Sequence, residues 1–187
     1  AARALAACGG DEPAQLTVFE RTPAPSGAEL TLPEVCAVDA FDFRADEDEL
    51  LVVYFGFTFC PDVCPTTLSD LRRALDDLGD AADRVSVAMA TVDPGRDTDE
   101  VISGYLRSFI DDGHPLRTDD DAALRAVTAV FGADYAVDVA DDGDIEVAHT
   151  GSLYAVDDQG HLVVTWPFGT RPDDLRSDLQ LLLDRSV

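Results

Sequence analysis

The chain has 187 residues, of which 46% are hydrophobic and 7% aromatic, so it is long enough for one folded domain with a substantial core, and wholesale disorder is excluded. Its formal net charge is −25, and all 13 basic residues are arginines that form no basic patch in the sequence, which excludes nucleic acid as a partner. No apolar run reaches the roughly eighteen residues of a membrane-spanning helix, so attachment to a membrane would require an anchor.

The N-terminal stretch contains the first of four cysteines. The sequence LAACGG (residues 5–10) resembles the lipobox of secreted lipoproteins, in which a signal peptide is cut before Cys8 and the thiol receives lipid. An alanine-rich tail with a chance cysteine is the alternative. We expect residues 1–27 to be a lipoprotein-like N-terminus and flexible tether, with a short strand within 16–20, and residues 28–187 to form the domain. The corresponding expectation is an exported protein anchored through Cys8 at the outer face of the cytoplasmic membrane.

A central strand and the helix after it are the clearest predicted elements. Residues 50–57 (LLVVYFGF) are continuously apolar and rich in β-formers, which is typical of a strand buried on both faces. Pro65 suits the first turn of a following helix, and Gly79 ends it. The apolar stripe of this helix consists of Leu68, Leu71, Leu75 and Leu78.

The other elements complete an α/β pattern. A hairpin strand is predicted within residues 37–43, before the central strand. After the first helix we predict a strand at 84–92, helices at 97–110 and 122–131, a strand at 135–139, hairpin strands at 152–156 and 161–166, and a helix at 172–183. This order indicates a mixed central sheet with helices on both faces.

Two cysteines lie where the central strand ends and the helix begins. Ligands of open α/β sheets gather at the carboxyl ends of strands, and Cys60 and Cys64 are four positions apart at a helix start, so their sulfurs can face one point. The helix N-terminus favours thiolate, and we therefore expect both cysteines to be more reactive than average. Thiolates select Cu(I) and leave room for one further ligand, typically imidazole. A structural pair of buried thiols is the alternative.

Three motifs carry a resemblance to a known family. The sequence FGFTFCPDVCP (residues 55–65) resembles the signature of the Sco/SenC family of copper-binding proteins. The sequence TVDPGRDT (91–98) is similar to the second motif of that family, and VAHTGSLY (147–154) is similar to the segment that holds its ligand histidine. The late hairpin, followed by Phe168 and Gly169, matches as well. The resemblance extends from about Leu30 to the C-terminus.

The resemblance implies a thioredoxin-like fold and one copper ion, Cu(I) or Cu(II), held by Cys60, Cys64 and His149. Family members help to insert copper into the dinuclear copper centre of cytochrome c oxidase, so the implied partners are the copper-centre subunit of the oxidase and a copper donor or thiol reductant. Two departures are visible. Phe59 replaces a histidine that many relatives have, and the acidic stretch 132–148 is divergent.

The other cysteine and the other histidines receive structural interpretations. Cys36 precedes an apolar strand and is predicted to be a small core residue in preference to a ligand. His114 lies in an expected loop, and His161 follows a tight turn and is expected to face solvent, so neither is predicted to bind metal.

Three aspartates near the motifs have both structural and functional interpretations. Asp62 lies between the two cysteines and either tunes the thiols, meets a partner or caps the turn. Asp93 and Asp97 are interpreted as a turn residue and a helix cap, with support of the metal ligands as the alternative for Asp93.

A thiol–disulfide oxidoreductase that acts through Cys60 and Cys64 is the alternative function. Thioredoxin-like oxidoreductases place a proline beside the dithiol, before a late strand, whereas AHTGS (residues 148–152) has none. The spacer between the cysteines also has three residues where such enzymes have two. Both features favour a metal carrier, while a peroxidase gives no reason for His149.

Overall fold

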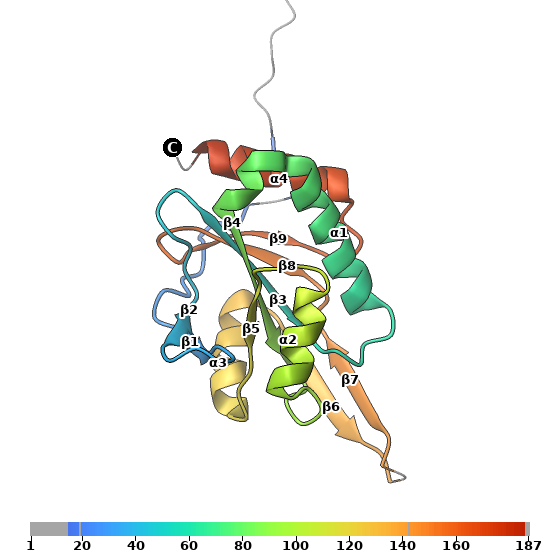
Figure 1. The fold of residues 1–187 in the computed structure, drawn as a ribbon. Coiled ribbons are helices and arrows are strands. Elements are labelled where there is room, and N and C mark those ends of the chain that lie inside the picture. The colour runs from blue at the N-terminus through green and yellow to red at the C-terminus, as the bar shows by residue number, and fades with distance from the viewer. Residues whose placement is uncertain (1–14, 19, 142, 186–187) are drawn as a thin grey trace, which may run out of the picture.

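The computed structural model describes residues 15–18, 20–141 and 143–185 (Figure 1). Five strands form the central sheet in the order β5-β4-β3-β8-β9. The strands β3 (Leu50–Gly56), β4 (Val85–Thr91) and β5 (His114–Leu116) run parallel, and β8 (Leu153–Val156) and β9 (Leu162–Trp166) are antiparallel to their neighbours. The mixed sheet predicted from the sequence is therefore confirmed.

The central strand β3 is buried along its whole length, as its apolar sequence predicted. It pairs with β4 in a register that sets Gly56 opposite Thr91, and with β8 in a register that sets Tyr54 opposite Leu153. Since successive side chains of a strand point to opposite faces, Tyr54 and Phe55 face different helices. Phe55 packs on Phe131 on one face, with ring centroids 5.3 Å apart.

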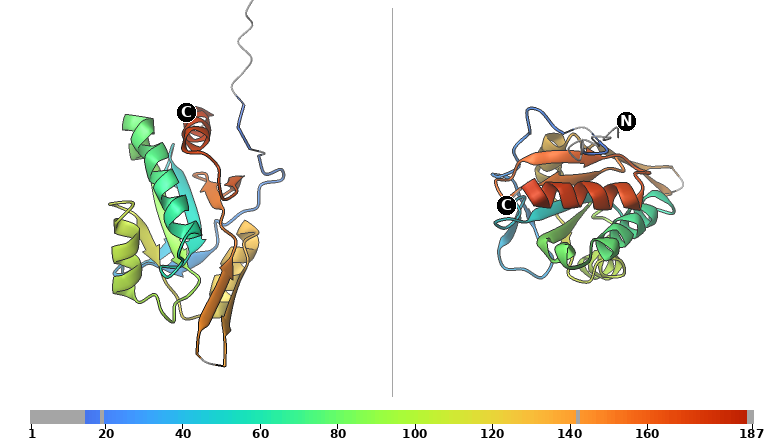
Figure 2. Two further views of the ribbon diagram at one scale, coloured as in Figure 1. Left: turned by 90° about the vertical axis from the view of Figure 1, so that its right-hand side faces the viewer. Right: turned by 90° about the horizontal axis from the view of Figure 1, so that it is seen from above.

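Helices lie on both faces of the sheet (Figure 2). The helices α1 (Val63–Leu78) and α2 (Asp99–Arg107) lie on one face, α3 (Asp121–Phe131) lies on the other, and α4 (Pro172–Arg185) packs beside α1. The predicted helix at 97–110 is shorter because Thr98 caps it, its side chain accepting a hydrogen bond from the Val101 amide. A six-residue 3₁₀ turn, Gly79–Arg84, leads from α1 to β4. Within the described residues, none of the helices has the length and apolar character required to cross a membrane.

Two small sheets accompany the central one. In the first, β1 (Thr31–Pro33) pairs with β2 (Ala40–Asp42), which is the core of the strand predicted at 37–43. In the second, β6 (Tyr135–Val139) pairs with β7 (Ile145–His149) in a hairpin that projects from the domain (Figure 1). The strands β1, β5 and β7 were not expected from the sequence.

Residues 15–18 and 20–27, predicted as part of a tether, contact the folded domain along β9 and α4. Glu20 forms an isolated bridge with Val164 in place of the short strand expected at 16–20. Asp178 of α4 is fully buried and accepts hydrogen bonds from the amide and hydroxyl of Thr17, both at 2.7 Å, and from the Trp166 indole at 2.8 Å. Cys8 and the lipobox-like sequence lie outside the described residues, and the division at residue 28 stays a prediction.

Candidate metal centre

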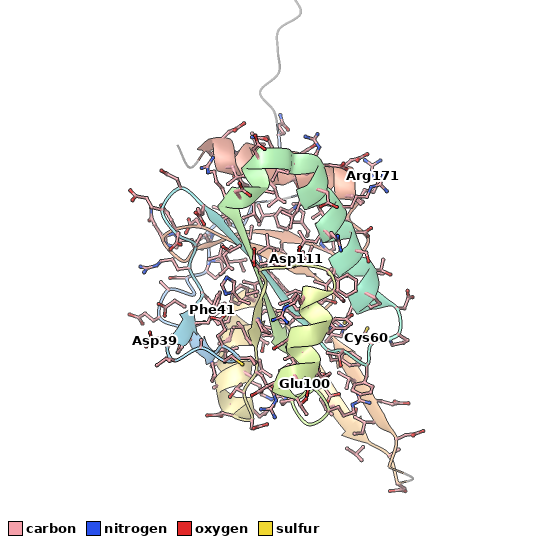
Figure 3. All side chains as sticks on the ribbon, viewed as in Figure 1. Asp39, Phe41, Cys60, Glu100, Asp111 and Arg171 are labelled. Atoms are coloured by element: carbon pink, nitrogen blue, oxygen red, sulfur yellow. The ribbon has the colours of Figure 1, made fainter. Side chains whose placement is uncertain are left out.

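The two cysteines occupy the junction between β3 and α1, as the sequence predicted, and Figure 3 shows Cys60 in the loop that precedes the helix. Cys60 lies in the loop before the helix and is 8% exposed, whereas Cys64 lies in the first turn and is fully buried. The Cys64 backbone amide donates a hydrogen bond to Cys60 Sγ at 3.2 Å. Neither cysteine is in a disulfide. The helix start therefore holds two free sulfurs in one small volume.

His149 completes a group of three potential ligands. It is the last residue of β7, and its Nε2 lies 3.4 Å from Cys64 Sγ. The ligand atoms of Cys60, Cys64 and His149 all lie within 4.8 Å of one another. No other group of three or more potential metal ligands is found in the described part of the chain. His149 Nδ1 lies 3.3 Å from the Thr150 carbonyl oxygen. With the ring proton on Nδ1, Nε2 presents its lone pair to the sulfurs.

Two glycines allow these segments to approach closely. A Cβ on Gly151 would lie 2.8 Å from Cγ1 of Val63, so the residues after His149 pass against the first residue of α1. A Cβ on Gly56 would lie 3.1 Å from Cys64 Sγ and 2.6 Å from Cε1 of Tyr54. The sulfur of Cys64 is thus packed against a strand that has no side chain at that point.

Aromatic rings enclose the imidazole. The Phe57 ring meets the His149 ring edge to face, at 5.5 Å between centroids, and the Tyr54 ring lies at 6.1 Å. Phe59 is 57% exposed, and the Arg96 guanidinium lies 5.0 Å from its ring centroid, in cation–π geometry. Arg96 also contacts Asp93 and the Ile145 carbonyl, so it links the loop after β4 to β7.

Burial shifts the pKa values of two of the ligand residues in opposite directions. It raises the pKa of the Cys64 thiol to about 12. It lowers the pKa of His149, so the imidazole is neutral at pH 7. The expectation of an unusually acidic thiol is wrong for Cys64, because loss of hydration outweighs the effect of the helix N-terminus there.

This donor set suits a soft metal ion. Two sulfurs and an imidazole nitrogen converge within 4.8 Å of one another, and thiolate and imidazole ligands favour copper or zinc over calcium or magnesium. The buried Tyr54 hydroxyl beside Cys64 has no hydrogen-bond partner among the described residues, which leaves a polar atom free at the edge of the group.

Comparison with known proteins agrees with the geometry. The sequence profile of SCO1/SenC matches residues 38–184, which is most of the chain. The chain belongs to the SCO1/SenC family. A putative copper-binding protein of Stutzerimonas stutzeri is 32% identical over 139 residues, covering 72% of this chain and 68% of the relative.

Solved structures of SCO1/SenC proteins share the thioredoxin-like fold. The structure of apo Sco1 from Thermus thermophilus has a TM-score of 0.76 and 30% identity, covering 90% of this chain and 97% of that one. The structure of Bradyrhizobium japonicum ScoI with copper bound has a TM-score of 0.71 and 28% identity, covering 87% and 99%.

A buried carboxylate fixes the loop of this SCO1/SenC chain that precedes Cys60. Asp97 is fully buried and accepts hydrogen bonds from the amide and hydroxyl of Thr58 and from the hydroxyl of Thr91, the last at 2.6 Å. Arg117 donates to the Asp97 carbonyl oxygen at 2.8 Å. Asp97 therefore joins the second motif to the cysteine loop, and the helix cap predicted for it is supplied by Thr98.

The remaining candidates lie apart from the ligand group. The prediction of a buried Cys36 is wrong, because this residue is exposed, with φ of +66°, in the turn after β1. His114 lies in β5, not a loop, with Nδ1 2.8 Å from Glu34 Oε1, and His161 is half-exposed beside Asp157. Neither belongs to the ligand group, as predicted.

The two other aspartates take structural positions at the edge of the site. Asp62 precedes α1 as its capping residue, is exposed, and makes no side-chain cap hydrogen bond. Asp93 is buried and pairs with Arg96. The sequence analysis did not single out Arg96 or Tyr54. The hydroxyl of Tyr54, the one polar side-chain group in the apolar strand β3, could have marked that residue as a candidate.

We predict that Asp97→Ala lowers the free energy of unfolding by about 3 kcal/mol, because three donors lose a buried acceptor. It should also speed thiol alkylation of Cys60, since Thr58 no longer holds the loop. Chemical denaturation and mass spectrometry after timed labelling measure the two effects. Glu100→Ala, at an exposed position in the first turn of α2, is the control and should change stability by no more than about 0.5 kcal/mol. Equal effects of the two substitutions would contradict this role.

We also predict that Cys64 of the metal-free protein stays protonated at pH 10, because burial raises its pKa to about 12. The ¹³Cβ chemical shift of Cys64, followed from pH 6 to 10, measures this directly. The urea-unfolded chain is the control, in which the same thiol should titrate near its ordinary pKa of about 8.5. Because the folded protein keeps this proton longer than the unfolded chain, stability should fall above that pH. A thiolate in the folded protein at pH 8 would refute the prediction.

Proposed function

We propose that this chain is a copper-binding metallochaperone that delivers copper to the dinuclear copper centre of cytochrome c oxidase. The observation that carries the proposal is the convergence of Cys60, Cys64 and His149 within 4.8 Å. Relatives support copper as the metal, since a putative copper-binding protein and a copper-bound ScoI both resemble this chain. Two soft thiolates favour Cu(I), with one ion per chain. The oxidase as recipient rests on the family resemblance.

Reduced protein should bind one equivalent of Cu(I) tightly in an anaerobic titration against a competing chelator. His149→Ala should weaken binding at least tenfold, because it removes one of three ligands. His161→Ala is the matched control, since this half-exposed histidine lies outside the ligand group, and it should bind like wild type. Binding that is absent, or indifferent to His149, would overturn the copper site.

The same titration should weaken as the pH is lowered. Copper must displace the proton that Cys64 holds up to a pKa of about 12, so affinity should fall about tenfold per pH unit for each proton released. His149 should add little to this slope near neutral pH, because burial keeps its imidazole unprotonated.

Copper delivery is tested with the recipient domain itself. Copper-loaded protein, mixed anaerobically with the metal-free, reduced copper-centre domain of the oxidase, should load that domain, as measured by metal analysis after separation of the two proteins. Cys64→Ser should not support this transfer. Copper that stays on the carrier at equilibrium would contradict delivery.

A second mixture, of the metal-free reduced protein with the oxidised recipient domain, tests the alternative function. Cys60 and Cys64 are free and adjacent, so they can pass two electrons and two protons to a partner disulfide and form a disulfide between themselves. If the metal-free reduced protein reduces the oxidised recipient domain, and the copper-loaded protein of the first mixture transfers no copper, then the chain is a thiol–disulfide oxidoreductase.

We further propose that the chain is exported and held at the outer face of the cytoplasmic membrane by lipid on Cys8, on the strength of the lipobox-like sequence LAACGG (residues 5–10). Cys8→Ser in cells should move the protein from the membrane fraction to the soluble fraction. Cys36→Ser is the control and should leave it with the membranes. An unchanged distribution of the Cys8 variant would refute the anchor.

A further inference from the structure

Tyr54 places a hydroxyl group in the core without a partner. The residue lies in the middle of β3 and is fully buried, and its Oη makes no hydrogen bond with any described residue. Burying an unpaired hydroxyl is unfavourable, and most buried hydroxyls are paired. A phenylalanine would fill the same space without this penalty, so the hydroxyl calls for a function.

The polar neighbours of this hydroxyl are Cys64 and Thr67, both on α1. The Thr67 hydroxyl donates to the Val63 carbonyl oxygen at 2.8 Å, so its proton is already used. Tyr54 and Cys64 meet at Gly56, where a Cβ would lie 3.2 Å from Cζ of the tyrosine ring and 3.1 Å from Cys64 Sγ. The tyrosine ring and the sulfur therefore both pack against Gly56.

A thiol sulfur and a metal-bound sulfur differ in how strongly each accepts a hydrogen bond. The neutral thiol is a weak acceptor, and its sulfur faces His149 Nε2 at 3.4 Å. A sulfur that coordinates a metal ion carries negative charge instead, and hydrogen bonds to charged acceptors are about twice as strong as neutral ones.

We propose that Tyr54 is a positioning residue whose hydroxyl donates a hydrogen bond to Cys64 Sγ when that sulfur coordinates the metal. The inference rests on the proposed copper site and assigns a further residue to it. The hydroxyl is unsatisfied in the metal-free protein and satisfied in the loaded one, so it favours the loaded state. It also orients the sulfur lone pairs, because Tyr54 is held in β3 between two paired strands.

Tyr54→Phe should have effects of opposite sign on folding and on binding. The metal-free variant should be as stable as wild type or more stable, because an unpaired buried hydroxyl is gone. Its affinity for Cu(I) should fall about tenfold, because a hydrogen bond to a charged sulfur is lost. With Cu(II), the sulfur-to-copper charge-transfer band should move to longer wavelength, since a sulfur without the hydrogen bond gives up an electron more easily.

Tyr105→Phe is the matched control. The Tyr105 hydroxyl, on α2, is also buried and without a partner among the described residues; it interacts electrostatically with Cys60 and Cys64 but makes no hydrogen bond to either. The control should leave both the affinity and the charge-transfer band at their wild-type values.

The experiment compares wild type, Tyr54→Phe and Tyr105→Phe by thermal unfolding without metal, Cu(I) competition and the Cu(II) spectrum. Weaker binding and a shifted band in Tyr54→Phe alone, without loss of stability, support the proposal. Unchanged affinity and spectrum overturn it, and so does a weaker affinity that comes with a destabilised metal-free protein, which indicates a packing role. A wild type that binds no copper overturns both the proposed function and this inference. A wild type that binds copper, with Tyr54→Phe unchanged from it, overturns the inference alone.

Discussion

The candidate site depends on the pairing of β3 along both of its edges. Its parallel neighbour β4 leads into the loop that carries Asp97, and its antiparallel neighbour β8 follows directly after His149. Three motifs that are far apart in the sequence thus meet at one end of one strand. A shift of one residue in either register would exchange the faces of Tyr54 and Phe55 and move these loops away from Cys60. The registers of β3 with β4 and β8 therefore fix the site.

Much of this arrangement could be predicted from the sequence, because strong local patterns specify it. The apolar run of β3, the leucine stripe of α1 and the glycine at its end predict their elements unaided, and the two cysteines follow from the junction between them. His149 was assigned through resemblance, since a lone histidine has no local pattern that marks a ligand. The metal, the recipient and the membrane anchor remain proposals.

What could not be predicted depends on contacts between distant residues. The short strands β1 and β5 and the hairpin strand β7 form because they pair with neighbouring strands, and their own sequences carry no pattern that predicts a strand. Cys36 next to apolar residues suggests burial, yet the turn leaves it exposed. The acidity of Cys64 was misjudged because a helix start alone does not reveal how completely its sulfur is removed from water. Tyr54 and Arg96 gain their importance only when the loops meet.

Burial also explains how a reactive set of side chains is compatible with a hydrophobic core. Raising the pKa of the Cys64 thiol and lowering that of His149 both favour uncharged forms, so neither side chain brings a charge into the core of the metal-free protein. Under the proposed function, charge would enter only when a cation replaces the protons on sulfur, and the positive charge of the cation would then offset negative charge on the sulfurs. For this reason the aromatic rings of Phe57 and Tyr54 can enclose the metal-free site without contacting a buried charge.

The two cysteines are unequally buried, so the site has a solvent-facing sulfur on Cys60 and an inner sulfur on Cys64. Cys60 retains 8% of its surface, while Cys64 has none. A ligand atom of another molecule that approaches from solvent can touch the first sulfur but not the second. Under the proposed function, an ion carried by such a ligand would therefore meet Cys60 before Cys64, and on departure Cys60 would be the last sulfur to release it. The difference in exposure alone would thus set the order in which the two sulfurs exchange the metal.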